Sequence, residues 1–121
     1  MTKEAALYQF WSSFGLPAYE ENSVPAQAAF PYISYEVITD NMGAKIGLTA
    51  SLWYHTGSWV TPNAKAQEIA EVLSNTGLTI PCDGGALWLQ RGQPWALSLT
   101  EEDQNIRRKY LNITAEFLTQ T

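Results

Sequence analysis

The sequence has one cysteine, Cys82, and one histidine, His55, among its 121 residues. A single cysteine cannot form an internal disulfide, and so few thiolate and imidazole ligands cannot build a structural zinc site. No apolar run approaches the roughly 18 residues of a membrane span, and the opening residues MTKEAALYQF lack the apolar region of a signal peptide. We therefore expect a soluble protein of a reducing compartment, with no membrane partner.

Charge is also scarce. Charged residues make up 16% of the chain, against about 25% in an average globular domain. Acidic residues outnumber basic ones by 12 to 7, which gives a net charge of -5 and argues against binding to free nucleic acid. Aromatic residues are plentiful, with five Trp, six Tyr and four Phe. Such residues fill either an aromatic-rich core or a protein interface, where charge is depleted and aromatics are enriched.

The length predicts one domain, residues 1–121. Apolar residues at helical spacing predict a first helix, which Thr2 caps and Gly15 ends. Its apolar stripe is Leu7, Phe10, Trp11 and Phe14. Residues 16–31 contain three prolines and have no periodicity, so we expect a long loop there.

Alternating residues predict strands over 32–37 and 45–55, which form an antiparallel hairpin around a turn at 39–43. One face of the second strand is apolar (Ile46, Leu48, Ala50, Leu52 and Tyr54). The opposite face is neither fully polar nor fully apolar, since it carries Thr49, Ser51, Trp53 and His55. A mixed face of this kind suits a surface that a partner covers.

A second helix is predicted between Thr61 and Gly77, with Pro62 at its favoured first position. Its apolar stripe is Ala66, Ile69, Ala70 and Leu73. Extended segments follow at 78–82, 86–90 and 107–118, with a turn at 83–85 and a break at 91–94. The sequence therefore predicts an α+β fold in the order α-β-β-α-β-β, an antiparallel sheet packed by helices.

No residues form a recognisable catalytic, cofactor or metal site. His55 and Cys82 have no partner at a telling spacing, so we expect a surface histidine and a buried structural thiol. The turn at Asp83-Gly84-Gly85 lacks the Lys-Ser/Thr of a phosphate loop. The acidic pairs and triplets, 20–21 and 101–103, lack the alternate spacing of a calcium loop. We expect no cofactor and no enzymatic activity.

Several segments of the sequence resemble a tail terminator family of long-tailed phages and prophages, also called tail-completion or tail-to-head joining proteins. The segments are WSSFGLPAYEENSVP from Trp11, FPYISYEVITDNMG from Phe30, LTASLWYHTGSW from Leu48, CDGGALWLQRGQPW from Cys82 and IRRKYLNITAEFL from Ile106. The resemblance implies a virion protein, assembled in the bacterial cytoplasm and placed between tail and head. It implies a hexameric ring that sits on the tail tube, stops its growth and receives the head.

The partners implied are other copies of the chain, the major tail tube protein and a head-completion or stopper protein. Phage DNA is expected to pass through the ring without specific binding, because an acidic ring repels phosphates. Three turn-rich segments are predicted to make the ring or tube contacts. The residues are Asp40, Asn41, Met42, His55, Trp59, Arg91 and Trp95. Two alternatives remain: another neck protein (a stopper or adaptor), or a small ligand-binding or enzymatic α+β domain.

Overall fold

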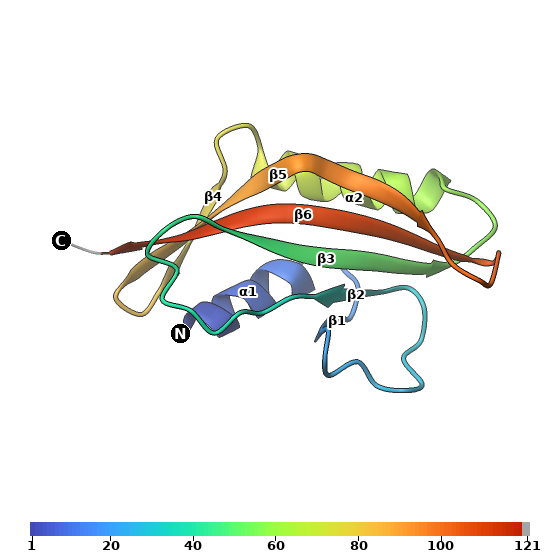
Figure 1. Cartoon of the computed structure of the whole chain (residues 1–121), viewed down its shortest axis with the longest axis horizontal. Helices are drawn as coiled ribbons and strands as arrows, with labels where there is room; N and C mark the ends of the chain where they lie inside the picture. The colour runs from blue at the N-terminus through green and yellow to red at the C-terminus, as the bar shows by residue number, and fades with distance from the viewer. Residues whose placement is uncertain (120–121) are drawn as a thin grey trace.

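Six strands form one sheet in the computed structural model, which describes residues 1–119 (Figure 1). The elements are α1 (Lys3–Ser12), β1 (Ala18–Glu20), β2 (Tyr32–Tyr35), β3 (Ile46–His55), α2 (Val60–Leu73), β4 (Leu78–Cys82), β5 (Gly85–Thr100) and β6 (Ile106–Thr119). The α+β class and the packing of helices on a sheet are confirmed. The predicted order α-β-β-α-β-β has one strand too few in each half, since each helix is followed by three strands, but the three extended segments predicted after the second helix are all strands (β4, β5 and β6). No helix within residues 1–119 has the length and apolarity needed to cross a membrane.

The sheet is mixed, with the strand order β1-β2-β3-β6-β5-β4. All neighbouring strands are antiparallel except β1 and β2, which are parallel, so the prediction of a wholly antiparallel sheet is wrong at this edge. β1 lies inside the stretch predicted as a loop. Backbone hydrogen bonds hold it there, from Ile33 N to Pro17 O at 2.8 Å and from Glu21 N to Tyr35 O at 2.7 Å. A strand of three residues is too short to show periodicity in the sequence.

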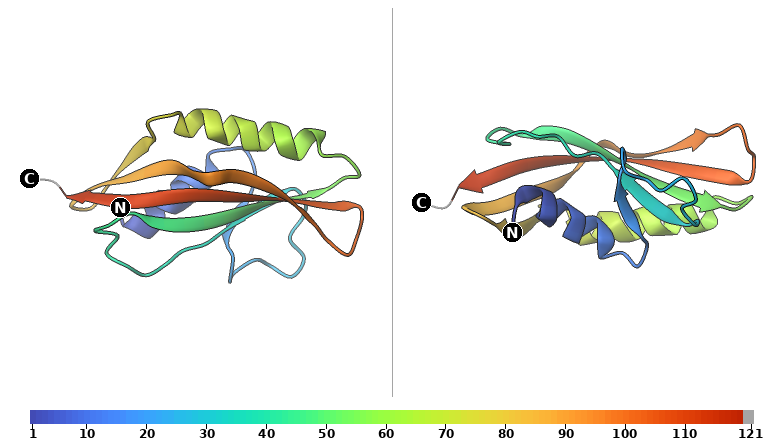
Figure 2. Two further views of the ribbon diagram at one scale, coloured as in Figure 1. Left: turned by 45° about the horizontal axis from the view of Figure 1, so that its top comes forward. Right: turned by 90° about the horizontal axis from the view of Figure 1, so that it is seen from below.

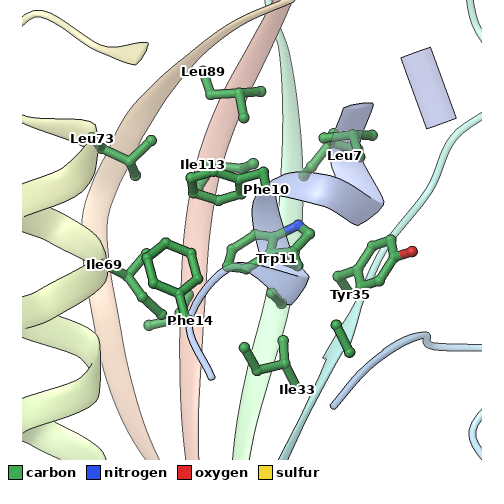
Figure 3. Packing of buried hydrophobic residues seen from close by; sticks show 14 of the residues in the cluster. Leu7, Phe10, Trp11, Phe14, Ile33, Tyr35, Ile69, Leu73, Leu89 and Ile113 are labelled. Atoms are coloured by element: carbon green, nitrogen blue, oxygen red, sulfur yellow. The ribbon is translucent and has the colours of Figure 1, made fainter. Parts of the chain in front are cut away.

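Both helices pack on the same side of the sheet (Figure 2). In α1, Thr2 is the predicted cap, and its Oγ1 accepts a hydrogen bond from Ala5 N at 3.1 Å. The helix ends at Ser12, earlier than the predicted end at Gly15. Its apolar stripe is buried as predicted and points at the sheet (Figure 3). The Phe10 ring meets the rings of Trp11 and Phe14 edge-on, at centroid distances of 4.8 and 5.2 Å.

The second helix, α2, begins one residue before its predicted cap. Trp59 occupies the N-cap position, and Ser58 Oγ accepts a hydrogen bond from Val60 N at 3.1 Å, so Thr61 is the second helical residue. The predicted apolar stripe is buried, together with Pro62. The helix ends at Leu73 and not close to Gly77.

The break predicted at 91–94 is a bulge inside one long strand. Arg91 of β5 pairs with Ile113 of β6, and pairing resumes between Ala96 and Leu111. The bulge closes on Asn112, whose Nδ2 donates to Pro94 O at 3.1 Å. Gly92 lies so near this residue that a Cβ there would come within 2.9 Å of Asn112 O. Beyond the bulge, β5 and β6 continue as a hairpin, with the acidic residues 101–103 at its turn.

The connection between β2 and β3 is not the tight hairpin turn that the sequence predicts. The two strands pair antiparallel as expected, from Tyr32 opposite Trp53 to Tyr35 opposite Ala50. In the connection, Asp40 Oδ1 accepts a hydrogen bond from Met42 N at 2.7 Å. Met42 O in turn accepts from Phe117 N of β6 at 2.7 Å, and the Met42 side chain is 1% exposed. The Met42 side chain therefore belongs to the core of the described chain.

Candidate docking surface on the uncovered face of the sheet

The face of the sheet opposite the two helices carries no other layer within residues 1–119 (Figure 2). Side chains alternate along each strand, so the neighbours of buried core residues point to this side. One row runs straight across the sheet, from Tyr19 through Ser34, Ser51 and Tyr110 to Leu97. We call this side the uncovered face. Its large side chains are half-buried or exposed, which leaves them accessible to a partner.

Aromatic rings gather on the uncovered face at the β1–β2–β3 end. The rings of Tyr32 and Trp53 stack at a centroid distance of 6.1 Å, and the Tyr19 ring meets Tyr32 edge-on at 5.9 Å. The Phe30 ring lies 5.4 Å from Tyr32 and 6.0 Å from His55. We call Tyr19, Phe30, Tyr32 and Trp53 the aromatic row. Large, rigid rings in partial contact with water are the side chains that dominate protein interfaces.

Arg108 of β6 extends the aromatic row. Its guanidinium lies 4.7 Å from the Trp53 ring centroid and 5.5 Å from that of Tyr110, within cation–π range. Its Nε donates to Ser51 Oγ at 3.0 Å, and Nη1 lies 3.6 Å from a Glu101 carboxylate oxygen. The side chain is thereby held against the aromatic rings.

Two buried serine hydroxyl groups orient side chains of the uncovered face. Ser34 and Ser51 are the buried polar residues of the described chain, and they lie on adjacent strands in register. Ser34 Oγ accepts a hydrogen bond from Trp53 Nε1 at 2.9 Å, as Ser51 Oγ does from Arg108. Trp53 and Arg108 are therefore oriented before any partner arrives, which lowers the entropy cost of binding.

Burial raises the pKa of three tyrosines. The largest cause at Tyr32, Tyr35 and Tyr54 is desolvation, which disfavours the phenolate; at Tyr32 the nearby Arg108 charge opposes it. The folded chain therefore holds these protons more tightly than the unfolded chain does. The resulting stability is complete below the unfolded pKa of about 10 and is lost as the pH rises through the folded values.

We expect the free energy of unfolding to fall when the pH is raised from about 9 to about 11, as denaturant titrations can measure. Tyr54→Phe removes one phenol from the core and should reduce this fall. An equal fall in Tyr54→Phe and in the parent would show that the Tyr54 phenol does not carry the effect.

The residues predicted as ring or tube contacts do not form one patch. Asp40 and Asn41 are exposed in the β2–β3 connection, far along the sheet from the aromatic row. His55 is exposed at the end of β3, where its ring adjoins Phe30, so it alone borders the uncovered face.

The other three predicted contacts lie on the helix side or in the bulge. Trp59 packs beside cations of β6, with its ring centroid 5.5 Å from Arg107 and 5.8 Å from Lys109. Arg91 ties the bulge to the end of α2, since its Nε donates to Ser74 O at 3.0 Å. Trp95 packs against the core, and its indole N–H is buried with no hydrogen-bond partner in residues 1–119.

Residues 1–119 form no pocket and no group of three or more His, Cys, Asp or Glu side chains that could hold a metal ion. His55 is exposed as predicted, whereas Cys82 is half-buried and not fully buried. Aromatic and cationic groups such as Trp53 and Arg108 lie side by side on the uncovered face, and both residue types are enriched in protein interfaces.

No protein-family model and no curated protein matches the sequence. Among solved structures, the chain is similar to one from the virion of a native gene transfer agent particle. The two share 22% sequence identity with a TM-score of 0.63, over 96% of this chain and 94% of the other. At this identity, the likeness shows a shared fold that spans both chains almost from end to end.

Proposed function

We propose that the chain is a structural, non-enzymatic component of a phage-like particle. The observation that carries this proposal is the whole-chain likeness to a protein in a gene transfer agent virion. The low charge and the pre-oriented aromatic row support it, because both suit a protein that works inside an assembly.

More specifically, we propose a tail terminator: a ring on the head-proximal end of the tail tube that stops tube growth and receives the head. This follows from the resemblance of the segments around Phe30 and Cys82 to that family. The partners are other copies of the chain, the tube protein and a head-completion protein. The uncovered face, with Trp53 and Arg108 on the two middle strands of the sheet, is one surface suited to such a contact.

The test is tube growth. The tail tube protein of the same phage or prophage is polymerised with and without this chain, and tube lengths are measured by electron microscopy. A terminator shortens the length distribution and is found at one tube end when no heads are present. A stopper or adaptor leaves naked tubes unchanged and binds only to completed tails or heads. If the chain neither changes tube length nor binds to tubes, completed tails or heads, the proposed function is wrong.

A single substitution tests the uncovered face within the same assay. Trp53→Ala should weaken tube-end binding by more than tenfold, since central tryptophans at interfaces cost about 2 kcal/mol or more when truncated. Tyr8→Ala, at an exposed aromatic on the helix side, is the matched control. Trp59→Ala and Trp95→Ala test the loop contacts predicted from the sequence. Unchanged binding in Trp53→Ala, beside a loss in either of the others, would move the contact away from the uncovered face.

A further inference from the structure

The second half of β5 is an open edge of the sheet. β4 pairs with β5 only from Gly85 to Leu89, whereas the stretch from Ala96 to Thr100 pairs with β6 alone. Within residues 1–119, no backbone hydrogen bond from a loop or another element reaches the outer side of this stretch. Its outward N–H and C=O groups are therefore free to pair with a further strand.

Within this stretch the edge lacks the charges and prolines that often block strand addition, although the bulge with Pro94 precedes it. The stretch ALSLT from Ala96 to Thr100 contains no charge, proline or glycine, and Leu97 is 43% exposed. Of the other edge strands, β4 contains Pro81, whereas β1 is a short edge of three residues without proline. Folded proteins seldom leave an uncharged edge strand bare, because it templates pairing with another chain. The stretch from Ala96 to Thr100 is therefore a candidate for pairing with a further strand.

The opposite edge, β1, lies at the same level of the sheet. Of its outward backbone groups, Glu20 O accepts a hydrogen bond from Ser23 N at 2.8 Å, and no loop or other element of the described chain bonds to those of Ala18. The row from Tyr19 to Leu97 joins the two edges directly. β1 runs parallel to β2 and antiparallel to β3, and β3 runs in the direction of β5. A second copy that continues the sheet from the β5 edge through its own β1 therefore forms an antiparallel pair. Such a head-to-tail contact repeats and can close into a ring.

Opposite charges also favour β1 of a second copy as the strand that pairs with this edge. Three of the seven cationic residues, Arg107, Arg108 and Lys109, are consecutive on β6 beside the open edge. Lys109 reaches across to β5, where its Nζ donates to Ser98 Oγ at 2.9 Å. β1 ends in Glu20 and is followed by Glu21, both exposed. An acidic β1 beside this cationic hairpin brings opposite charges together, although the acidic turn at 101–103 limits the contact to the stretch before it.

We propose that the edge of β5 from Ala96 to Thr100 pairs with β1 of a second copy of this chain. This rests on the proposed ring and names the surface that builds it. The pairing extends one continuous sheet from subunit to subunit, with all helices on one side and all uncovered faces on the other.

Cross-linking between two variants tests the pairing. Both carry Cys82→Ser; one also carries Ser98→Cys and the other Glu20→Cys, at positions that are exposed and lie on the same side of the sheet. The mixed variants are treated with a short bismaleimide, in concentrated solution and on tube ends. We expect the mixed product, which joins position 98 of one variant to position 20 of the other, to exceed either homodimer at least tenfold. A dominant homodimer through position 98, or cross-links from that position to the tube protein instead, would overturn the proposal.

Leu97→Lys supplies the second test, because a lysine on an edge strand is the usual block to strand addition. Leu118→Lys is the matched control: it also places a lysine at a half-exposed leucine (39%) on the same face of the sheet. Leu97→Lys should keep the parent melting temperature but lose the mixed cross-link at least tenfold, whereas Leu118→Lys should lose neither. Equal cross-linking in both variants would refute edge pairing.

The two proposals fail in different ways. Mixed cross-links without capping of tubes would leave edge pairing intact and reject the tail role. Capping of tubes with no mixed cross-link would keep the tail role and reject edge pairing.

Discussion

Phe10→Ala is expected to lower the free energy of unfolding by about 3–5 kcal/mol, which is the usual cost of truncating a buried aromatic residue. Phe10 is 3% exposed and lies between α1 and the sheet, against the rings of Trp11 and Phe14 (Figure 3). Neighbouring aromatics are rigid, so the cavity left by the substitution cannot collapse fully. Urea denaturation measures the change.

Leu111→Ala, at a fully buried leucine of β6, should cost about 2–5 kcal/mol by the same mechanism. Tyr8→Ala is the control, since Tyr8 is an exposed aromatic on the same helix as Phe10 and should cost less than about 1 kcal/mol. Losses below about 1 kcal/mol for both core variants would mean that α1 does not pack on the sheet as described.

Gly77→Ala is the second large effect, with an expected loss of about 2–4 kcal/mol from positive φ and steric overlap together. Gly77 has φ +88°. A Cβ there would lie 2.5 Å from Trp88 Nε1 and 2.8 Å from Leu89 O. The indole cannot simply move away, because its Nε1 donates to Thr76 O at 3.0 Å. Either β5 shifts or this hydrogen bond is lost.

Gly15→Ala separates the two causes. Gly15 has φ +79°, but a Cβ added there would meet no atom within 4 Å beyond its chain neighbours, so alanine at this position meets only the positive φ. We expect a loss of about 1 kcal/mol. Thermal unfolding of both variants gives the comparison. Equal losses of stability would show that steric overlap between a side chain at position 77 and β5 does not contribute to the effect.

The sequence predicts the core well because burial leaves a periodic signal. The stripes of α1 and α2 and the apolar faces of β3 and β6 are all found where their spacing places them. The sequence predictions fail where contacts between residues distant in the sequence determine the local structure. β1 depends on pairing with β2, far along the chain, and the strand after the bulge depends on β6. Met42 is predicted as a turn residue, but its carbonyl oxygen accepts a hydrogen bond from Phe117 N of β6.

The candidate surface is only partly visible in the sequence. The mixed face of β3 is visible in the sequence through Trp53 and His55, which are half-buried and exposed in the structure. Its partners Tyr32 and Arg108 are missed, because each looks like an ordinary outward residue of its own strand. The pairing register of β2, β3 and β6 brings Tyr32 and Arg108 beside Trp53. The register between strands that are distant in the sequence cannot be predicted from the local residue pattern. The loop tryptophans are conspicuous in the sequence, but neither belongs to the aromatic row. Trp95 packs against the core, and Trp59 lies beside cations of β6.

The two faces of the sheet set different limits on how such a chain can diverge. The buried side carries most of the stability, so substitutions there are restricted by volume and shape. The uncovered face contributes little to the core and can exchange its rings and charges while the same backbone persists. A lineage built on this scaffold can therefore acquire a new partner without passing through an unfolded intermediate.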